Sequence, residues 1–99
     1  MEHKCIKSER GTVHYWINRK HNKRSRCIVF THGLTANHLM FEKQVDYFSD
    51  DFTVITWDVP LHGKSRPYKD FSYKNCAADL KEILDTENIS QVILVGMSM

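Results

Sequence analysis

The residues with the clearest chemical potential are a glycine and a serine close to the last position of the sequence. Gly96-Met97-Ser98-Met99 follows directly after Val92–Val95, a run of branched apolar residues without polar alternation. Such a run is typical of a strand that is buried on both faces in a parallel sheet. A serine on a tight turn after such a strand has an exposed hydroxyl, which predicts a nucleophile at Ser98.

A second group with chemical potential is His32-Gly33-Leu34, which comes after the apolar run Cys27–Phe30. Gly33 allows a sharp departure from the strand, and the backbone N–H of Leu34 is predicted to point at a developing oxyanion. By itself, such a group is also typical of a strand-to-helix turn that needs glycine.

A third group is the loop Asp58–Ser65, which follows the apolar run Phe52–Trp57. Asp58 is predicted to accept hydrogen bonds from N–H groups of this loop, and Pro60 and Gly63 restrict its path. Open α/β sheets place their sites at the carboxyl ends of parallel strands. We therefore expect the three groups to meet at one edge of a sheet.

Strands and helices must position these groups. Thr12–Asn18 alternates apolar and polar residues, which predicts a strand, and the turn Glu9-Arg10-Gly11 pairs it with a first strand at Cys5–Ser8. The residues expected on its buried face are Val13, Tyr15 and Ile17.

Two helices are predicted between the later strands. Asn37 is a candidate N-cap of the first, which extends to about Asp50 and has Phe41, Val45 and Phe48 at helical spacing. Ser72 is a candidate N-cap of the second, and Asn88 suits its left-handed C-terminal position. The residues expected on the apolar stripe of the second helix are Tyr73, Ala77, Leu80 and Leu84, with Cys76 and Ile83 beside it.

The order of these elements predicts an α/β fold: N-terminal antiparallel strands followed by a mostly parallel sheet with flanking helices. The chain has 99 residues, which is one small domain at most. No apolar stretch approaches the ~20 residues of a membrane helix, and residues 1–7 lack the apolar core of a secretory signal. The odd number of cysteines (Cys5, Cys27 and Cys76) and their wide spacing favour free thiols and a cytoplasmic location over disulfides or a zinc site.

The net charge of +2 is too small to indicate a nucleic-acid or membrane partner. Most of the excess lies in Arg19–Arg26, which is interpreted as a solvated loop between two strands in preference to a phosphate-binding patch. No aromatic residues separate its basic ones, as base stacking on a nucleic acid would require. The sequence contains neither G-x-G-x-x-G nor G-x-x-x-x-G-K-[ST], the motifs that would indicate a nucleotide cofactor. We expect no cofactor and no metal ligands.

Residues 28–99 resemble the N-terminal half of an α/β-hydrolase fold serine hydrolase. Gly96-Met97-Ser98-Met99 is similar to the nucleophile elbow, His32-Gly33-Leu34 to the oxyanion turn, and Asp58–Ser65 to the D-x-P-G-x-G-x-S loop, with Leu61 in place of a glycine. The resemblance implies that Ser98 attacks the carbonyl of a small acyl substrate. It also implies that the N–H groups of Leu34 and Met99 form the oxyanion hole. The implied supporting residues are His32, Gly33, Asp58, Gly96 and Met97. A serine at the elbow disfavours the dehalogenase and epoxide-hydrolase branches, which use aspartate there.

The catalytic acid and histidine of this family follow the serine in the chain, whereas all six histidines here precede Ser98. We therefore interpret residues 1–99 as the N-terminal portion of one hydrolase domain and expect the chain alone to be inactive. A rearranged triad using His32 or His62 is the less favoured alternative. With nothing beyond Met99, Val92–Val95 is expected to form an exposed apolar edge that self-associates. A non-catalytic α/β module that binds a small ligand or a partner chain remains the competing hypothesis.

Overall fold

The computed structural model describes residues 1–19, 26–33 and 35–97, and in this part of the chain five strands form one mixed sheet. The spatial order is β1-β2-β4-β3-β5. β1 pairs antiparallel with β2 and β2 antiparallel with β4, whereas β3 is parallel to both β4 and β5. The bounds are Glu2–Lys7 for β1, Thr12–Asn18 for β2, Cys27–Thr31 for β3, Thr53–Trp57 for β4 and Val92–Gly96 for β5. The predicted fold class is confirmed.

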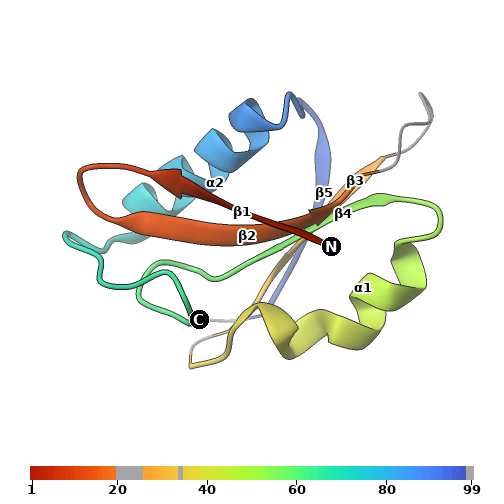
Figure 1. Ribbon diagram of the computed structural model, residues 1–99, viewed down its shortest axis with the longest axis horizontal. Helices are drawn as coiled ribbons and strands as arrows, with labels where there is room; N and C mark the ends of the chain where they lie inside the picture. The colour runs from red at the N-terminus through yellow and green to blue at the C-terminus, as the bar shows by residue number, and fades with distance from the viewer. Residues whose placement is uncertain (20–25, 34, 98–99) are drawn as a thin grey trace.

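Two helical segments cover opposite faces of this sheet (Figure 1). The short 3-10 helix η1 (His38–Phe41) leads into α1 (Glu42–Phe48), and α2 spans Tyr73–Thr86. On the α2 face, Ile83 packs with residues of the central strands and of the β1–β2 hairpin. On the α1 face, Val45 packs against residues of β3 and β4.

The N-terminal hairpin forms as predicted, except that β1 begins earlier than the apolar pattern indicates. Backbone hydrogen bonds between Ser8 and Gly11 close the turn, and Val13 and Tyr15 are buried. β1 starts at Glu2 rather than Cys5 because its ladder with β2 continues through polar residues, as far as the pair Glu2 and Ile17. Backbone pairing, which apolar periodicity does not report, sets this end of the strand.

Both predicted helix N-caps are confirmed. The side chain of Asn37 accepts a hydrogen bond from the N–H of Leu39, and Ser72 accepts one from the N–H of Asn75. At the other end of α2, Asn88 has a left-handed φ of 58°, and the N–H of Ile89 donates to the carbonyl of Leu84. This is the 6→1 bond of a Schellman motif, and the left-handed position of Asn88 is as the sequence predicted.

The apolar stripe predicted for α2 is confirmed for Leu80 and Leu84, and for Cys76 and Ile83 beside it, which pack on the core, but it is wrong for the first two residues of the stripe. Tyr73 is 68% exposed and Ala77 is also exposed, while Asp79 and Ile83 are the buried residues of the helix. The Asp79 carboxylate also lies inward, where the Arg10 guanidinium and the Tyr68 hydroxyl both bind it. A carboxylate is buried only when it is paired in this way, so apolar periodicity alone could not place it.

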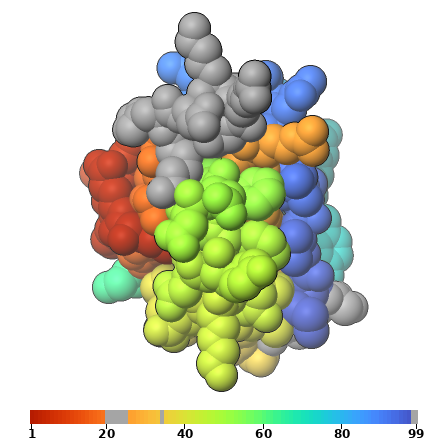
Figure 2. Space-filling view, turned by 90° about the vertical axis from the view of Figure 1, so that its right-hand side faces the viewer, coloured from red at the N-terminus to blue at the C-terminus, as the bar shows by residue number. Residues whose placement is uncertain are grey.

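β5 is one end strand of the sheet among the described residues, and it is not covered on its outer side (Figure 2). Ile93 is 42% and Leu94 63% exposed, while Val92 and Val95 pack partly on the two cores. The sequence therefore correctly predicted a strand at this position and its exposed apolar edge. Burial on both faces, which the apolar run also favoured, is not seen among the described residues.

Candidate functional site

The three groups identified in the sequence follow neighbouring parallel strands, and β3 is the central strand of the three. The N–H of Met97 donates to the carbonyl of Thr31 at 3.2 Å, so the segment after β5 is attached to the end of β3. The turn at His32-Gly33 begins one residue after Thr31. The segment that carries the predicted nucleophile and the turn that carries the predicted oxyanion donor therefore start at the same edge.

Three of the predicted site residues, namely Leu34, Ser98 and Met99, lie outside the described residues. The supporting residues His32, Gly33, Asp58, Gly96 and Met97 are described. Gly96 ends β5 with its Cα beside Thr31, and a Cβ there would make only ordinary contacts with Thr31. Within the described structure, space around Gly96 does not by itself require a glycine.

The His32 side chain is buried at the base of the first turn, with 1% of its surface exposed. Its Nε2 accepts a hydrogen bond from the N–H of Val59 at 3.0 Å, which leaves the proton on Nδ1 to be donated to the carbonyl of Gly33 at 2.8 Å. Burial lowers the pKa of His32, although the bond to Gly33 opposes this effect. The ring is therefore neutral at pH 7 and ties the turn to the loop that follows β4.

Neither alternative triad histidine is favoured by this arrangement. Both ring nitrogens of His32 already have partners, so this ring has no free lone pair with which to accept a proton. His62 lies in the loop, 5.0 Å from His32 between ring centroids, and its Nδ1 lies 3.1 Å from the carbonyl of Pro60. These contacts give both histidines roles in holding the turn and the loop.

The turn after β3 also contacts η1. The N–H of Gly33 donates to the Met40 sulfur at 3.3 Å, and the carbonyl of Gly33 accepts the N–H of Ala36. Thr35 adopts a left-handed φ of 67°, a conformation that costs a threonine energy. The hydrogen bond from Ala36 to Gly33 and the left-handed Thr35 thus form a tight turn between the end of β3 and η1.

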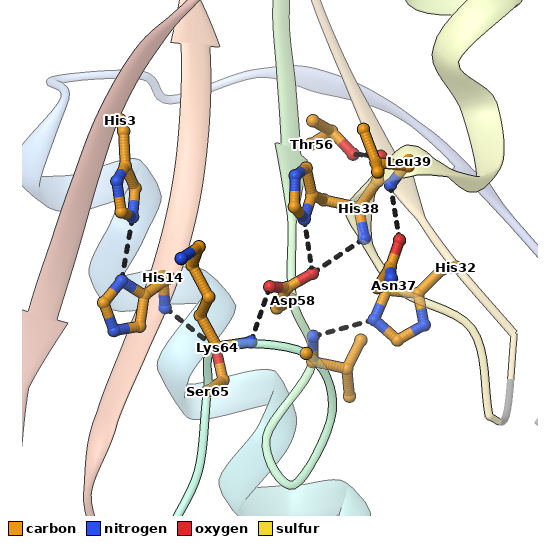
Figure 3. Close-up of polar contacts among 12 residues, drawn as sticks. His3, His14, His32, Asn37, His38, Leu39, Thr56, Asp58, Lys64 and Ser65 are labelled. Carbon is orange, nitrogen blue, oxygen red and sulfur yellow. Dashed lines mark hydrogen bonds and ion pairs between the residues drawn. The ribbon is translucent and has the colours of Figure 1, made fainter.

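Asp58 is the central residue of the third group, the loop Asp58–Ser65. It is fully buried, and its carboxylate accepts hydrogen bonds from the N–H groups of Lys64 at 2.9 Å and of His38 at 2.7 Å, and lies 2.8 Å from the His38 Nδ1 (Figure 3). Burial alone raises the pKa of Asp58, but these hydrogen bonds outweigh it and leave the pKa below its ordinary value. The sequence predicted the loop N–H donors but not the contact with His38, which is 20 residues away.

Backbone geometry explains two further residues of this loop. Gly63 has a φ of 49°, and a Cβ on it would lie 2.3 Å from the Asp58 carboxylate, so only glycine fits. Leu61, which stands where the resembling family usually has glycine, has a φ of 71° and is 45% exposed. Its left-handed conformation costs a residue with a Cβ roughly 1–2 kcal/mol.

His38 connects this site to the hairpin. Its ring stacks on Trp16 at 3.5 Å between centroids, and Trp16 in turn stacks on His3 at 4.6 Å. The three rings come from β1, β2 and η1, so this stack exists only in the folded chain. No sequence signal predicted it, because neither the spacing of the residues nor their local pattern indicates that they meet.

In the described part of the chain, no three His, Cys, Asp or Glu side chains are gathered closely enough to hold a metal ion. The described helices include none that is long and apolar enough to cross a membrane.

Comparison with known proteins agrees with this architecture. The sequence profile of the α/β-hydrolase fold matches residues 26–99. This chain belongs to the α/β-hydrolase fold family. The central strands, the His32-Gly33 turn and the Asp58 loop described above are therefore parts of a hydrolase domain.

Among curated relatives, the chain is 33% identical over 73 residues to 3-oxoadipate enol-lactonase 1 of Acinetobacter baylyi, covering 74% of this chain and 27% of that protein. It is 37% identical over 76 residues to the AB hydrolase superfamily protein YisY of Bacillus subtilis, covering 75% of this chain and 28% of that protein. The chain thus spans little more than a quarter of the length of these relatives.

Solved structures show the same fold. A hydrolase from Rickettsia typhi superposes with a TM-score of 0.87 and 22% identity, covering 100% of this chain and 40% of that one. An N-acyl homoserine lactonase, AidH, superposes with a TM-score of 0.81 and 18% identity, covering 95% of this chain and 35% of that one. An epoxide hydrolase from Pseudomonas aeruginosa reaches 0.85 at 16% identity, over 98% of this chain and 33% of that one. At these identities the likeness establishes the fold and not the reaction.

Proposed function

We propose that residues 1–99 are the N-terminal portion of a serine hydrolase domain that acts on a small acyl substrate such as a carboxylic ester or lactone. One observation carries the proposal: a glycine and a serine, as Gly96-Met97-Ser98, follow the parallel strand β5 at the edge where Met97 binds Thr31. The relatives named as enol-lactonase and as 2-(acetamidomethylene)succinate hydrolase support a hydrolytic reaction.

In the proposed reaction, the Ser98 hydroxyl attacks the substrate carbonyl and a histidine accepts its proton. The N–H groups of Leu34 and Met99 stabilise the oxyanion, and water then releases the acyl group. One such donor contributes about 3–4 kcal/mol to lowering the barrier. In this proposal His32 and Asp58 hold the oxyanion turn and the loop beside it, without touching the reacting atoms.

The proposal also predicts that the 99-residue chain is inactive by itself. All six histidines precede Ser98, and the ring nitrogens of His32 are already bonded to Gly33 and Val59. The acid and the base of the triad must then come from sequence that follows Ser98. A cytoplasmic location is part of the same proposal, based on the three cysteines, which are unpaired in the structure.

The experiment that tests the nucleophile is covalent labelling with a fluorophosphonate probe, in a protein that carries this segment together with a downstream acid and histidine. Labelling is expected in the parent protein and lost in Ser98→Ala. Ser90→Ala is the matched control, because Ser90 is exposed and precedes β5. Labelling that persists in Ser98→Ala would exclude this nucleophile. A parent protein that is not labelled at all would favour the competing, non-catalytic hypothesis.

A further inference from the structure

The turn between β3 and η1 is attached at both of its ends to two consecutive residues that follow β4. At its start, His32 Nε2 accepts a hydrogen bond from the N–H of Val59 at 3.0 Å. At its end, the N–H of His38 donates to Asp58 Oδ1 at 2.7 Å. Asp58 and Val59 are both fully buried, so the same short segment of the interior holds both ends of the turn.

The His38 ring makes a second bond to the same carboxylate oxygen, because its Nδ1 lies 2.8 Å from Asp58 Oδ1 (Figure 3). Burial raises the pKa of Asp58, but its hydrogen bonds outweigh burial and lower the pKa, so the carboxylate is ionised at pH 7. An ionised carboxylate only accepts hydrogen bonds, which places the proton on His38 Nδ1. The other carboxylate oxygen accepts the N–H of Lys64 at 2.9 Å. One buried carboxylate therefore joins the start of η1 to the loop after β4.

Two further contacts fix the position of His38. The Trp16 indole stacks on its ring, with the centroids 3.5 Å apart and an angle of 13° between the ring planes. The Thr56 hydroxyl donates to the His38 carbonyl at 3.0 Å, so β4 also holds the backbone at this residue. With its side chain 18% exposed, His38 is held from the hairpin, from β4 and from the loop after β4.

The ring is the part of this arrangement that depends on histidine. A backbone N–H at position 38 is present in every residue type except proline, and with that bond alone the start of η1 can pivot about Asp58 Oδ1. The ring closes a second bond to the same oxygen, which fixes the direction of the chain as well as its position. The hydrogen bond from the N–H of Ala36 to the carbonyl of Gly33 connects this end of the turn to the other.

We propose that His38 is a positioning residue of the hydrolase site, whose ring holds the oxyanion turn through its bond to Asp58 while Trp16 holds the ring. This inference rests on the proposed function, which assigns the oxyanion donor to Leu34, between His32 and His38 in the sequence. A donor stabilises an oxyanion well only if it is held in place before the charge develops. His38 itself touches neither the substrate nor the reacting atoms.

The clamp is tested first on the chain as it stands, by amide hydrogen exchange measured with NMR, which requires no catalysis. His38→Phe keeps an aromatic ring for Trp16 but has no N–H for Asp58. Because a hydrogen bond to a charged group is lost, the amides of Ala36 and Val59 are expected to exchange about tenfold faster or more. The amide of Val29 in β3 should exchange as in the parent, which verifies that the variant is folded.

Two further variants separate the bond from the stack. His38→Asn has a side-chain N–H near the position of Nδ1 and should exchange more like the parent than His38→Phe does. His3→Phe is the matched control, because His3 also stacks on Trp16 but forms its hydrogen bond with His14. It should leave the turn unchanged. Unchanged exchange of Ala36 in His38→Phe, or equal acceleration in His3→Phe, would overturn the clamp.

The catalytic part is tested in a protein that carries this segment together with a downstream acid and histidine, with p-nitrophenyl acetate as substrate. His38→Phe is expected to lower kcat about tenfold with KM unchanged, because the oxyanion forms only in the transition state. His38→Asn should restore much of the kcat, and His3→Phe should retain all of it. An unchanged kcat in His38→Phe would overturn the positioning role in an active enzyme. A parent protein that neither hydrolyses the ester nor reacts with the fluorophosphonate would instead overturn the proposed function, and the positioning role with it.

Discussion

The two end strands of the described sheet are built in opposite ways. β1 carries Glu2, Lys4 and Lys7, and charged side chains on an end strand disfavour pairing with another sheet. β5 has no charged residue, and Ile93 and Leu94 are largely exposed on it. The comparison indicates that the β5 edge, unlike the β1 edge, offers an apolar surface suited to further packing.

Charged contacts with α2 show the same asymmetry. At the β1 end, Glu87 is 6% exposed and binds the Tyr15 hydroxyl at 2.5 Å, the Lys4 ammonium at 3.0 Å and the Arg19 guanidinium at 3.0 Å. A second buried carboxylate, Asp79, binds Arg10 at 2.7 Å. No ion pair involves β5 among the described residues. Paired charges therefore fix the hairpin to the helix, while β5 is held by its ladder with β3 and by apolar packing.

The largest effect is expected from a charge on the apolar edge. We expect the 99-residue chain to self-associate through β5 and Leu94→Lys to weaken this association about a thousandfold. Burying one leucine stabilises by about 2 kcal/mol, and a symmetric dimer contains two. Sedimentation velocity over a range of concentrations measures the effect.

Leu39→Lys is the matched control for this substitution, because Leu39 is 55% exposed but lies on η1, away from the sheet edges. It should associate as the parent chain does. A parent chain that is monomeric at all concentrations would contradict the role assigned to the β5 edge.

The next largest effect is expected from removing the buried carboxylate of α2, Asp79. Asp79→Ala is expected to lower the free energy of unfolding by about 3 kcal/mol, because it leaves the Arg10 guanidinium without its carboxylate partner. Urea unfolding, followed by tryptophan fluorescence in the Leu94→Lys background, measures this change. Asp85→Ala is the control and should have little effect, since Asp85 forms an exposed pair with Lys81. Equal effects of the two substitutions would argue against a structural role for Asp79.

The smallest effect is expected from removing the charge of Glu87, whose contribution to the free energy of unfolding depends on pH. Burial opposes the charge on Glu87, but hydrogen bonds from Tyr15, Lys4 and Arg19 outweigh it and lower the pKa below its ordinary value of 4.5. The resulting stabilisation is complete above pH 4.5 and is lost as the pH falls through the lowered pKa. Glu87→Gln should lower the free energy of unfolding by about 1–2 kcal/mol at pH 7.

Urea unfolding between pH 7 and pH 3 separates this contribution from the others. The parent is expected to lose more stability than Glu87→Gln across this range, since glutamine does not titrate. An equal loss of stability in the parent chain and in Glu87→Gln would show that other carboxylates account for the sensitivity to acid.

Much of the fold was predictable because local patterns determine it. Alternating residues predicted β2, apolar runs predicted β3, β4 and β5, and Asn37 and Ser72 were correctly identified as helix N-caps. A cap depends on residues within one helical turn, so the sequence contains the whole of the signal. The inward position of Asp79 could not be predicted in the same way, because its partners are distant: Arg10 is 69 residues away and Tyr68 is 11.

For Asp79 a weaker signal was present. It lies three residues after Cys76 and four before Ile83, which is the spacing of one helix face. A carboxylate at helical spacing from apolar residues has two explanations: that face of the helix is exposed, or the carboxylate is buried in an ion pair. The sequence by itself does not distinguish them. The inward position was decided by the Arg10 side chain.

The sequence by itself determined where strands and helices form and which short groups end the parallel strands, because both depend on neighbouring residues. It also sufficed to indicate the hydrolase family. Tertiary structure alone decided that His38 binds Asp58 and that His3 meets His14. These contacts join residues on different strands and loops. Their geometry is set by strand register and by the packing of α1 and α2 on the sheet, which exist only once the chain has folded.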